Sequence, residues 1–450
     1  MTERDEQRYD AVVLGGGWAG LSAAREILRH RPQFSVLVLE REPESQSGGL
    51  LRSETIDGFT FDVGGPHLLF SRYPETLSEV KEVLEGNFIE LPRRSFVLFE
   101  DTFVPYPFEN GLFTLRPETR ARLGRGVIEA MLQRGGSPQW VPKDFRDWIY
   151  GLFGDAIARE YLEPYNLKVW KRPLEELSAD WVHTPGRLPL PSLSALIQSI
   201  AGMETIGYQE QSKFFYPRSG GIESLYRAAL SGVRKRGVEV RFESPVRSIQ
   251  RRDDCWWVNR TLSTDTIVNT LPLPEAMDMI RLLPNTSTLI PTFDYNQVVV
   301  VGIALDQPTP DQTAVYVPRS DVVFHRYTWM SYMNRVGDGR SNLIAEVTVP
   351  KDVRCDITSL QREVVQGLLQ LGIVQTRESI RFVRAWLNTY GYPVYHKDTT
   401  AVSRQVLDAL GAHGFHSVGR WGSWEYWNTD MVLRAVQATI PRALGATTRD

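Results

Sequence analysis

The chain has 450 residues with 51 Lys and Arg against 54 Asp and Glu, and this formal charge of −3 excludes a protein that holds nucleic acid over a broad basic surface. Its 42% hydrophobic and 23% charged residues are typical of a globular protein and exclude disorder as the overall state. The two cysteines, Cys255 and Cys355, lie far apart without clustered histidines, so we expect neither a metal site nor a disulfide framework.

The start of the chain is polar and does not have the pattern of a signal peptide. The most apolar stretch, residues 297–305, is far too short to cross a bilayer. These two observations predict a soluble cytoplasmic protein without a membrane span.

A glycine-rich turn follows the first predicted strand. Residues 11–14 (AVVL) have the pattern of a buried strand, and residues 21–30 (LSAAREILRH) have helical periodicity. Between them, Gly15, Gly17 and Gly20 satisfy GxGxxG. The first glycine allows a tight turn, the second lets a diphosphate approach the backbone, and the third lets helix and strand pack closely.

A second predicted strand, residues 34–40 (FSVLVLE), ends at Glu40, 20 residues beyond Gly20. A carboxylate at this place can accept hydrogen bonds from the hydroxyl groups of an adenosine ribose. Strand, glycine turn, helix, strand and acidic residue in this order predict a dinucleotide-binding unit, with NAD and FAD as the candidates.

Two further glycine pairs, Gly48-Gly49 and Gly64-Gly65, lie in turns after Glu40 and indicate a second close approach of the backbone to a long cofactor. The order of Glu40, GG, LxRS and FDxGG resembles the FAD-dependent superfamily that includes amine oxidases, protoporphyrinogen oxidases, phytoene desaturases and UDP-galactopyranose mutases. This resemblance implies FAD rather than NAD as the cofactor.

The rest of the chain divides the expected fold into three parts. Residues 91–209 have mostly helical periodicity, whereas alternating apolar residues over 297–349 predict an antiparallel sheet. We therefore expect an α/β protein with a Rossmann-like FAD-binding domain of the GR2 type, a helical insertion and an antiparallel-sheet substrate domain. The expected bounds are 1–90, 210–272 and 400–450 for the discontinuous FAD-binding domain, 91–209 for the insertion and 273–399 for the sheet domain.

Several segments resemble the UDP-galactopyranose mutases more closely, in particular the eukaryotic branch. They are FDVGGPHLLFS, FGDAIA followed by PYNLKVW, YPRSGGI, AVYVP followed by FHRY, YGYPVY and GRWGSWEYWNTD, scattered over nearly the whole chain. The resemblance implies that reduced FAD interconverts the pyranose and furanose forms of a nucleotide sugar without net oxidation. Such chemistry needs cations beside the diphosphate leaving group, where charge develops in the transition state.

The same resemblance implies roles for single residues. Arg326 matches a diphosphate-binding arginine, and His67 matches a histidine beside the flavin, in a loop where this chain has an inserted proline, Pro66. These two are the expected catalytic residues. The expected substrate-binding residues are Trp148 in a uridine pocket, Glu163, Asn166, Tyr316, Tyr392 and Tyr426. The expected cofactor-binding residues are Gly15, Gly17, Trp18, Ala19, Gly20, Glu40, Arg41, Gly48, Gly49, Leu50, Gly65, His67, Val246, Gly419, Tyr426, Asp430 and Met431.

Glu163 departs from the pattern of the mutases, which have a second diphosphate-binding arginine directly before the PYN motif. A carboxylate in a partly desolvated cleft would repel a diphosphate. Arg159, four residues earlier on the same predicted helix face, is expected to pair with Glu163. Lys168, Lys171 and Arg172 are candidates to supply the missing positive charge.

Three functions therefore stay open. The first is the redox-neutral rearrangement of a nucleotide sugar. The second is oxidation of another small molecule by an enzyme of the protoporphyrinogen oxidase, amine oxidase or desaturase type, which Glu163 favours because a neutral or cationic substrate would accept it. The third is non-catalytic binding of FAD or of a partner. The sequence leaves the sugar, the electron acceptor and the oligomeric state open.

Overall fold

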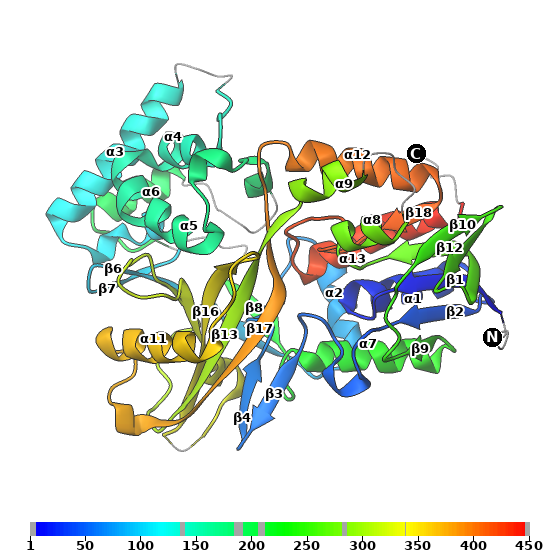
Figure 1. Cartoon of the computed structure of the whole chain (residues 1–450). Helices are drawn as coiled ribbons and strands as arrows, with labels where there is room; N and C mark the ends of the chain where they lie inside the picture. Colours follow the sequence, from blue (N-terminus) through cyan, green and yellow to red (C-terminus); the bar gives the residue numbers. More distant parts are fainter. Residues whose placement is uncertain are drawn as a thin grey trace.

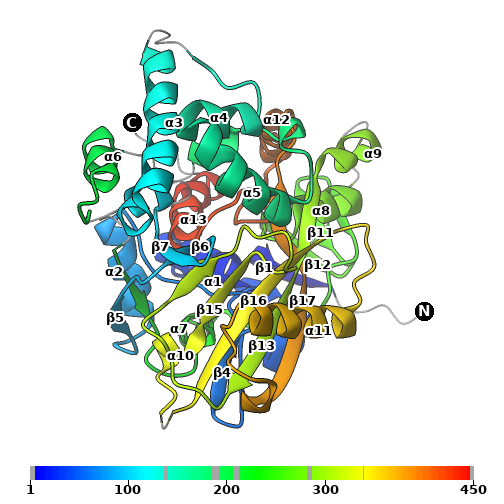
Figure 2. The same cartoon turned by 90° about the vertical axis from the view of Figure 1, so that its left-hand side faces the viewer.

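The computed structural model describes residues 6–135, 140–183, 192–205, 212–280, 286–337 and 339–445. Two large sheets lie side by side, a first one that contains β1 and a second one that contains β13 (Figure 1). Four helices lie above the second sheet. These helices are α3 (Pro117–Gly135), α4 (Phe145–Ile157), α5 (Glu163–Trp170) and α6 (Leu193–Ile200). The view turned by 90° shows α3, α4 and α5 above the strands of the second sheet (Figure 2).

The first sheet has the strand order β10-β11-β12-β1-β2-β9, and β18 also pairs with β12. The pairs among β12, β1, β2, β9 and β18 are parallel, whereas β10 and β11 add antiparallel pairs at one edge. The bounds are Gln7–Leu14 for β1, Val36–Leu39 for β2, Glu239–Arg241 for β9, Ile249–Arg252 for β10, Cys255–Val258 for β11, Leu262–Asn269 for β12 and Phe415–Ser417 for β18.

Helices cover both faces of the parallel strands, which explains the unbroken apolar run in β1. Ala11 and Val13 belong to one core with α1 (Trp18–His30), α7 (Glu223–Lys235) and α13 (Thr429–Ala443). Val12 and Leu14 belong to a second core with α8 (Leu273–Ile280) and α12 (Thr399–Ala412). A strand buried on both faces is apolar throughout instead of alternating.

The second sheet has the order β17-β13-β16-β15-β14-β6-β7 and is antiparallel except between β14 and β6. Val299 and Val301 of β13 pack with α11 (Ile357–Gln370), whereas Val298 faces a cavity on the opposite side. The predicted antiparallel sheet is confirmed. The bounds are Phe96–Phe99 for β6, Thr102–Pro105 for β7, Asp294–Leu305 for β13, Ala314–Tyr316 for β14, Arg326–Trp329 for β15, Ser341–Pro350 for β16 and Ile380–Val394 for β17.

The region expected to be a mostly helical insertion, residues 91–209, also contains the strands β6 and β7, which extend the second sheet. Each has four residues, too few to give a clear period in a sequence rich in helical pattern. β5 (Ile89–Pro92) pairs with β8 (Lys213–Tyr216) in antiparallel fashion. The chain therefore enters and leaves this region on two neighbouring strands.

The remaining regular elements connect these parts. They are β3 (Ser53–Ile56), β4 (Phe59–Asp62), α2 (Pro74–Val83), α9 (Thr286–Leu289), α10 (Met330–Asn334), the π-helical turn η4 (Ala158–Leu162), and the 3-10 turns η1 (Glu44–Gln46), η2 (Phe108–Asn110), η3 (Leu112–Thr114), η5 (Leu174–Glu176), η6 (Asp180–His183), η8 (Ile290–Thr292) and η9 (Arg377–Ser379). Over the described residues, every helix is too short or too polar to cross a bilayer.

An ion-pair network joins the loop after α5 to the second sheet. Asp294, at the start of β13, is only 5% exposed and accepts hydrogen bonds from Arg172 at 3.0 Å and from His396 at 3.0 Å. Lys351 lies 3.4 Å from the same carboxylate. Burial opposes ionisation, but His396, Arg172 and Lys351 together lower the pKa of Asp294 to about 2.

We expect Asp294→Asn to lower the free energy of unfolding by about 3 kcal/mol at neutral pH, because it leaves partly buried cations without their partner. The folded carboxyl has the lower pKa, so its stabilisation is complete above the unfolded value of 3.8 and is lost as the pH falls toward 2. Urea unfolding at pH 7 and at pH 3 should therefore show a difference between wild type and variant that shrinks in acid. Asp306→Asn, which breaks an exposed pair with Arg381, is the control.

Candidate active site

A cavity of about 630 Å³ begins at the glycine turn between β1 and α1. It collects predicted cofactor residues that lie far apart in the sequence, namely Gly15, Gly17, Trp18, Ala19, Glu40, Arg41, Gly48, Gly49, Leu50, His67 and Val246. Gly65 and Tyr426 line a neighbouring cavity. Gly20, Gly419, Asp430 and Met431 lie outside both linings.

The glycines of the first turn meet two different physical needs. A Cβ atom on Gly20 would lie 1.9 Å from the carbonyl oxygen of Gly15, so a larger residue would force α1 away from β1. The place of a Cβ atom on Gly17, in contrast, has no other atom within 4 Å. Gly49 lies across from it, because its own Cβ would be 4.0 Å from the Cα of Gly17. Gly17 and Gly49 thus leave room for a ligand directly against the backbone.

Glu40 follows β2 at its carboxyl end and is 9% exposed. Its Oε2 accepts a hydrogen bond from the backbone N–H of Gly16 at 2.9 Å, and its Oε1 accepts one from the N–H of Glu42 at 2.9 Å. These bonds fix the carboxylate beside the glycine turn and in the cavity wall. A ribose hydroxyl placed there would meet a ready acceptor.

The start of α13 closes the other side of this cavity. The indole Nε1 of Trp18 donates to the carbonyl oxygen of Thr429 at 3.0 Å, and Ser71 donates to the buried carboxylate of Asp430 at 2.7 Å. A Cβ atom on Gly419 would lie 2.6 Å from the Cβ of Ala19. Gly419 and Asp430 therefore do not line the cavity but pack against or bind residues next to it.

A second cavity, of about 230 Å³, adjoins the first. The two share Leu50, His67, Asn388, Arg420, Trp427, Asn428 and Thr429 as a common border. An elongated dinucleotide with its diphosphate at Gly17 and its ribose at Glu40 would reach this border with its far end. The residues present thus fit such a cofactor, and they leave the second cavity for a substrate beside it.

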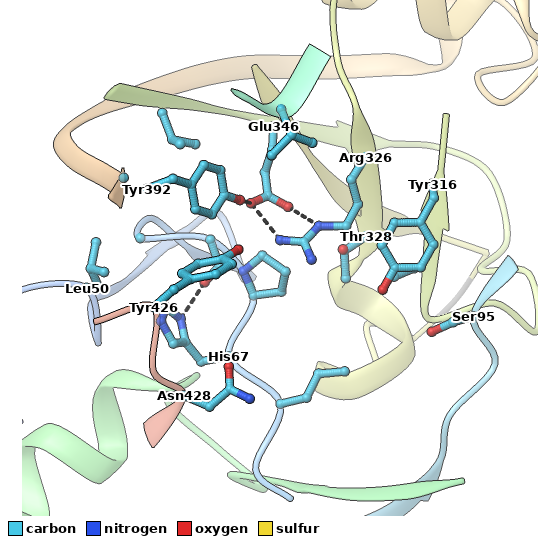
Figure 3. Close-up of a pocket in the computed structure, with 18 of the residues that line it drawn as sticks. Leu50, His67, Ser95, Tyr316, Arg326, Thr328, Glu346, Tyr392, Tyr426 and Asn428 are labelled. Atoms are coloured by element: carbon cyan, nitrogen blue, oxygen red, sulfur yellow. Dashed lines mark hydrogen bonds and ion pairs between the residues drawn. The ribbon is translucent and has the colours of Figure 1, made fainter. Parts of the chain in front are cut away.

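The second sheet supplies the polar wall of the substrate cavity. Figure 3 shows Arg326, Glu346 and Tyr392 converging, with Tyr316 and His67 beside them. Arg326 of β15 lies directly opposite Glu346 of β16 in the strand register. Side chains on one face of a sheet repeat every second residue and meet their cross-strand partners, which places this pair together.

Arg326 and Glu346 form an ion pair through two hydrogen bonds, in which Glu346 is buried and the side chain of Arg326 is partly buried. Nε of Arg326 donates to Oε2 of Glu346 at 2.5 Å, and Nη2 donates to Oε1 at 2.8 Å. Burial opposes both charges, but each side chain stabilises the other, so the pKa of Arg326 rises well above its ordinary value and that of Glu346 falls below its own. The hydroxyl of Tyr392 also donates to Oε1 of Glu346, at 3.2 Å.

His67 lies at the border of the two cavities. Its Nδ1 is 2.8 Å from the carbonyl oxygen of Gly65, which requires that this nitrogen carry the proton. Burial lowers the pKa of His67 to about 4, so the ring is neutral at physiological pH. The other ring nitrogen, Nε2, is then an acceptor at the border where the cofactor and the substrate would meet.

The segment from η4 into α5 brings Tyr161, Leu162, Tyr165 and Asn166 into the substrate cavity. A π-helical turn is rare and is often found at functional sites. The side-chain amide of Asn166 donates to the carbonyl oxygen of Leu162 at 2.8 Å and accepts from the indole of Trp170 at 3.1 Å. Asn166 is thus held by its own helix at the cavity wall.

Trp148 does not line the described part of either cavity, contrary to the expectation of a base-binding role. It is 4% exposed and packs between Phe145, at 6.0 Å between ring centroids, and Phe153, at 5.7 Å. A large aromatic ring on the apolar face of α4 gains more by burial in the helical core than by facing solvent.

The expected ion pair between Glu163 and Arg159 is wrong. Glu163 accepts a hydrogen bond from Nε of Arg146 at 3.1 Å and another from the hydroxyl of Tyr150, whereas Arg159 pairs with Asp155 at 3.1 Å. Glu163 also lies outside the lining of the substrate cavity. Its carboxylate therefore does not face a substrate there, and the expected repulsion of a diphosphate does not arise from this residue.

Two of the three candidates for a compensating charge, Lys168 and Arg172, bind other groups. Lys168 donates to two backbone carbonyl oxygens, at 2.7 and 3.0 Å, and burial lowers its pKa to about 7. Arg172 belongs to the Asp294 network, and Lys171 ends α5 in a left-handed conformation. All three lie outside the lining of the substrate cavity.

We expect Glu163→Gln to change kcat/KM by less than about twofold, because its side chain does not reach the substrate cavity. The free energy of unfolding should fall by about 1 kcal/mol, since the partly exposed bond to Arg146 loses its charge. Steady-state kinetics and urea unfolding measure the two effects. A fall in kcat/KM of tenfold or more would contradict this placement of Glu163.

The sequence did not predict several polar residues of the substrate cavity, among them Arg93, Tyr106, Tyr165, Glu346 and Arg420. Tyr165 and Arg420 stand inside the PYNLKVW and GRWGSWEY segments, so those matches could have indicated them. Arg93 follows β5 and donates to the hydroxyl of Tyr316 at 3.1 Å, a partner more than 200 positions away. No local pattern could reveal such a contact.

Comparison with known proteins connects this geometry to flavin chemistry. The family model described as flavin containing amine oxidoreductase matches residues 18–371. Among curated proteins, 4,4'-diapolycopene oxygenase of Methylomonas sp is 25% identical over 63% of this chain and 59% of its own length. (S)-6-Hydroxynicotine oxidase of Paenarthrobacter nicotinovorans is 24% identical over 39% of this chain and 42% of its own, and pseudooxynicotine dehydrogenase of Pseudomonas sp is 40% identical over 16% and 14%. The chain thus spans less than two thirds of each of these relatives.

Solved structures share the fold over almost the whole chain. A reduced UDP-galactopyranose mutase superposes with a TM-score of 0.88 at 23% identity and covers 98% of this chain and 95% of its own. A putative protoporphyrinogen oxidase from Exiguobacterium sp. has a TM-score of 0.72 at 18% identity, with 98% and 99% covered. A putrescine oxidase variant has 0.61 at 15% identity, with 98% and 99% covered. At these identities the likeness concerns the fold, and it confirms the predicted α/β class.

Proposed function

The chain belongs to the family of flavin-containing amine oxidoreductases, and from that premise we propose that it is a nucleotide-sugar mutase that interconverts pyranose and furanose forms with reduced FAD. FAD is the cofactor of this family, as predicted, and its members are enzymes. Reduced FAD supplies a nucleophilic ring nitrogen when bound. The residues that would hold it are those of the first cavity, with the diphosphate at Gly17 and Gly49, the ribose at Glu40 and the flavin at the shared border.

The charge of the substrate cavity carries the proposal. Three arginines, Arg93, Arg326 and Arg420, line the described part of this cavity together with a single carboxylate, that of Glu346, and His67 is neutral. This surplus of cations is complementary to a diphosphate. An enzyme that releases and recaptures a nucleoside diphosphate needs such groups where negative charge develops.

Tyrosine hydroxyls add the groups that a sugar requires. Tyr316, Tyr392 and Tyr426 line the same cavity and carry polar hydroxyl groups on apolar rings. They can bind sugar or phosphate oxygens while they exclude water. The sugar itself would lie at the border beside His67, within reach of the flavin.

A second candidate is the oxidation of a different small molecule by FAD. Glu346 favours it, because its buried carboxylate offsets Arg326 and lowers the surplus of positive charge in the cavity. A neutral substrate would then meet an aromatic pocket at the flavin border. The family match is compatible with this chemistry as well.

One set of measurements separates the two candidates. The purified flavoprotein is reduced with dithionite, titrated with UDP, and incubated with UDP-galactopyranose and other nucleotide sugars, whose furanose forms are detected by chromatography. We expect UDP to bind and conversion to occur only after reduction. Conversion of none of the sugars, together with anaerobic bleaching of the oxidised flavin by a neutral substrate, would support the oxidoreductase instead.

A further inference from the structure

Glu346 is the only carboxylate in the described lining of the substrate cavity, and it is 2% exposed. It occupies two of the three nitrogen atoms of the Arg326 guanidinium. The third nitrogen, Nη1, has no hydrogen-bond partner among the described residues. In Figure 3 it points away from Glu346 into the cavity. Nη1 of Arg326 therefore remains as the nitrogen that can donate hydrogen bonds to a substrate.

The carboxylate also contacts the other groups that surround the reacting end of the cavity. Tyr392 donates to Oε1, and a Cβ atom on Gly65 would lie 3.1 Å from the same oxygen. Gly65 in turn holds the ring of His67 through its carbonyl oxygen. One oxygen of Glu346 thus lies between the guanidinium, the tyrosine and the histidine loop.

We propose that Glu346 is a positioning residue that fixes the direction of Arg326 and, by offsetting its charge, limits how tightly the cavity holds a diphosphate before the reaction. This inference rests on the proposed mutase function. A fork-like pair to a carboxylate fixes the plane of a guanidinium, which a single bond would leave free to rotate. An arginine with its full charge would hold substrate and product equally tightly, and such uniform binding does not raise kcat.

The test is Glu346→Gln, which keeps the size of the side chain and removes its charge. Inorganic pyrophosphate is the binding probe, measured by calorimetry on the reduced holoenzyme. We expect pyrophosphate to bind about tenfold more tightly, because Arg326 is no longer offset. Turnover should move in the opposite direction, with kcat for the nucleotide sugar about 100-fold lower, because Arg326 is no longer held in place.

Two further variants separate positioning from mere structural damage. Glu79→Gln removes one partner of the ion pair with Arg25, which lies outside both cavities, and should change neither value by more than about twofold. Glu346→Asp keeps the charge, so the affinity for pyrophosphate should stay near that of wild type while kcat falls partway. In an Arg326→Lys background, Glu346→Gln should have little further effect, because the two residues act as one unit.

Flavin absorbance and thermal unfolding establish that each variant is folded. If Glu346→Gln weakens pyrophosphate binding or leaves it unchanged, or if kcat is unaffected, the inference is overturned. If Glu346→Gln fails to fold, the test rests on Glu346→Asp. A lower affinity of Glu346→Asp for pyrophosphate than that of the wild type would contradict the inference. Failure of the proposed function shows itself separately, as an absence of sugar conversion in the wild type, and the pyrophosphate titrations still test the charge effect.

Discussion

Under the proposed mutase function, Arg326→Ala should lower kcat/KM for the nucleotide sugar by about a thousandfold, because it removes a partly buried cation that would face the departing diphosphate. The change also leaves Glu346 buried without its partner, which adds a negative charge to the cavity. Arg326→Lys should lower kcat/KM by about a hundredfold, since a lysine keeps the charge but cannot form both hydrogen bonds to Glu346. Steady-state kinetics with the reduced enzyme give kcat/KM for the wild type and for both variants.

The matched control is Arg319→Ala. Arg319 pairs with Asp321 at 2.6 Å in the same sheet region, but its side chain lies outside both cavities. Its kcat/KM should stay within about twofold of the wild-type value. If Arg326→Ala retained a tenth or more of the activity, Arg326 would not be the group that stabilises the leaving diphosphate.

Gly17→Val should abolish FAD binding and leave the fold intact. The backbone at Gly17 has a φ of −73°, which any residue adopts, and no protein atom lies within 4 Å of the added Cβ. The new side chain would instead fill the space where the diphosphate must approach the backbone. Flavin content after purification should fall to less than about a tenth of the wild-type value, with circular dichroism unchanged.

Two comparisons make this prediction specific. Gly411→Val places a branched side chain in open space at the end of α12, away from the cavities, and should keep its full flavin content. Gly20→Ala drives a methyl group against the carbonyl oxygen of Gly15 and should cost about 2 kcal/mol of stability instead. A yellow Gly17→Val protein would show that the diphosphate lies elsewhere.

The cofactor half of the molecule could be predicted because its signals are local. A strand, three glycines, a helix and Glu40 follow one another within a short stretch, and each has its own physical reason for its residue type. The substrate half depends on pairings between distant strands. The contact between Arg326 and Glu346 follows from the register of β15 and β16, which the sequence alone does not specify.

The incorrect expectations also have a physical cause in side-chain direction. Spacing along a helix predicts which residues share a face, but it does not predict which neighbouring helix that face meets. Glu163 pairs with Arg146 and Tyr150 on α4, and Lys168 donates to backbone carbonyl groups of the loop that follows β14. Both contacts are long-range and became visible only when the packing of α4 and α5 was known.

The pairing of β5 with β8 has a consequence for how such proteins can change. The region from residue 93 to residue 212 is connected to the rest of the chain through β5 at its start and β8 at its end, and these two short strands pair with each other. Its helices supply one wall of the substrate cavity, while the glycine turn and Glu40 belong to the other part of the molecule. Insertions, deletions and substitutions in these helices can therefore change the shape of the substrate cavity without shifting the register of the first sheet. The substrate can change in this way during evolution while the cofactor cavity stays the same.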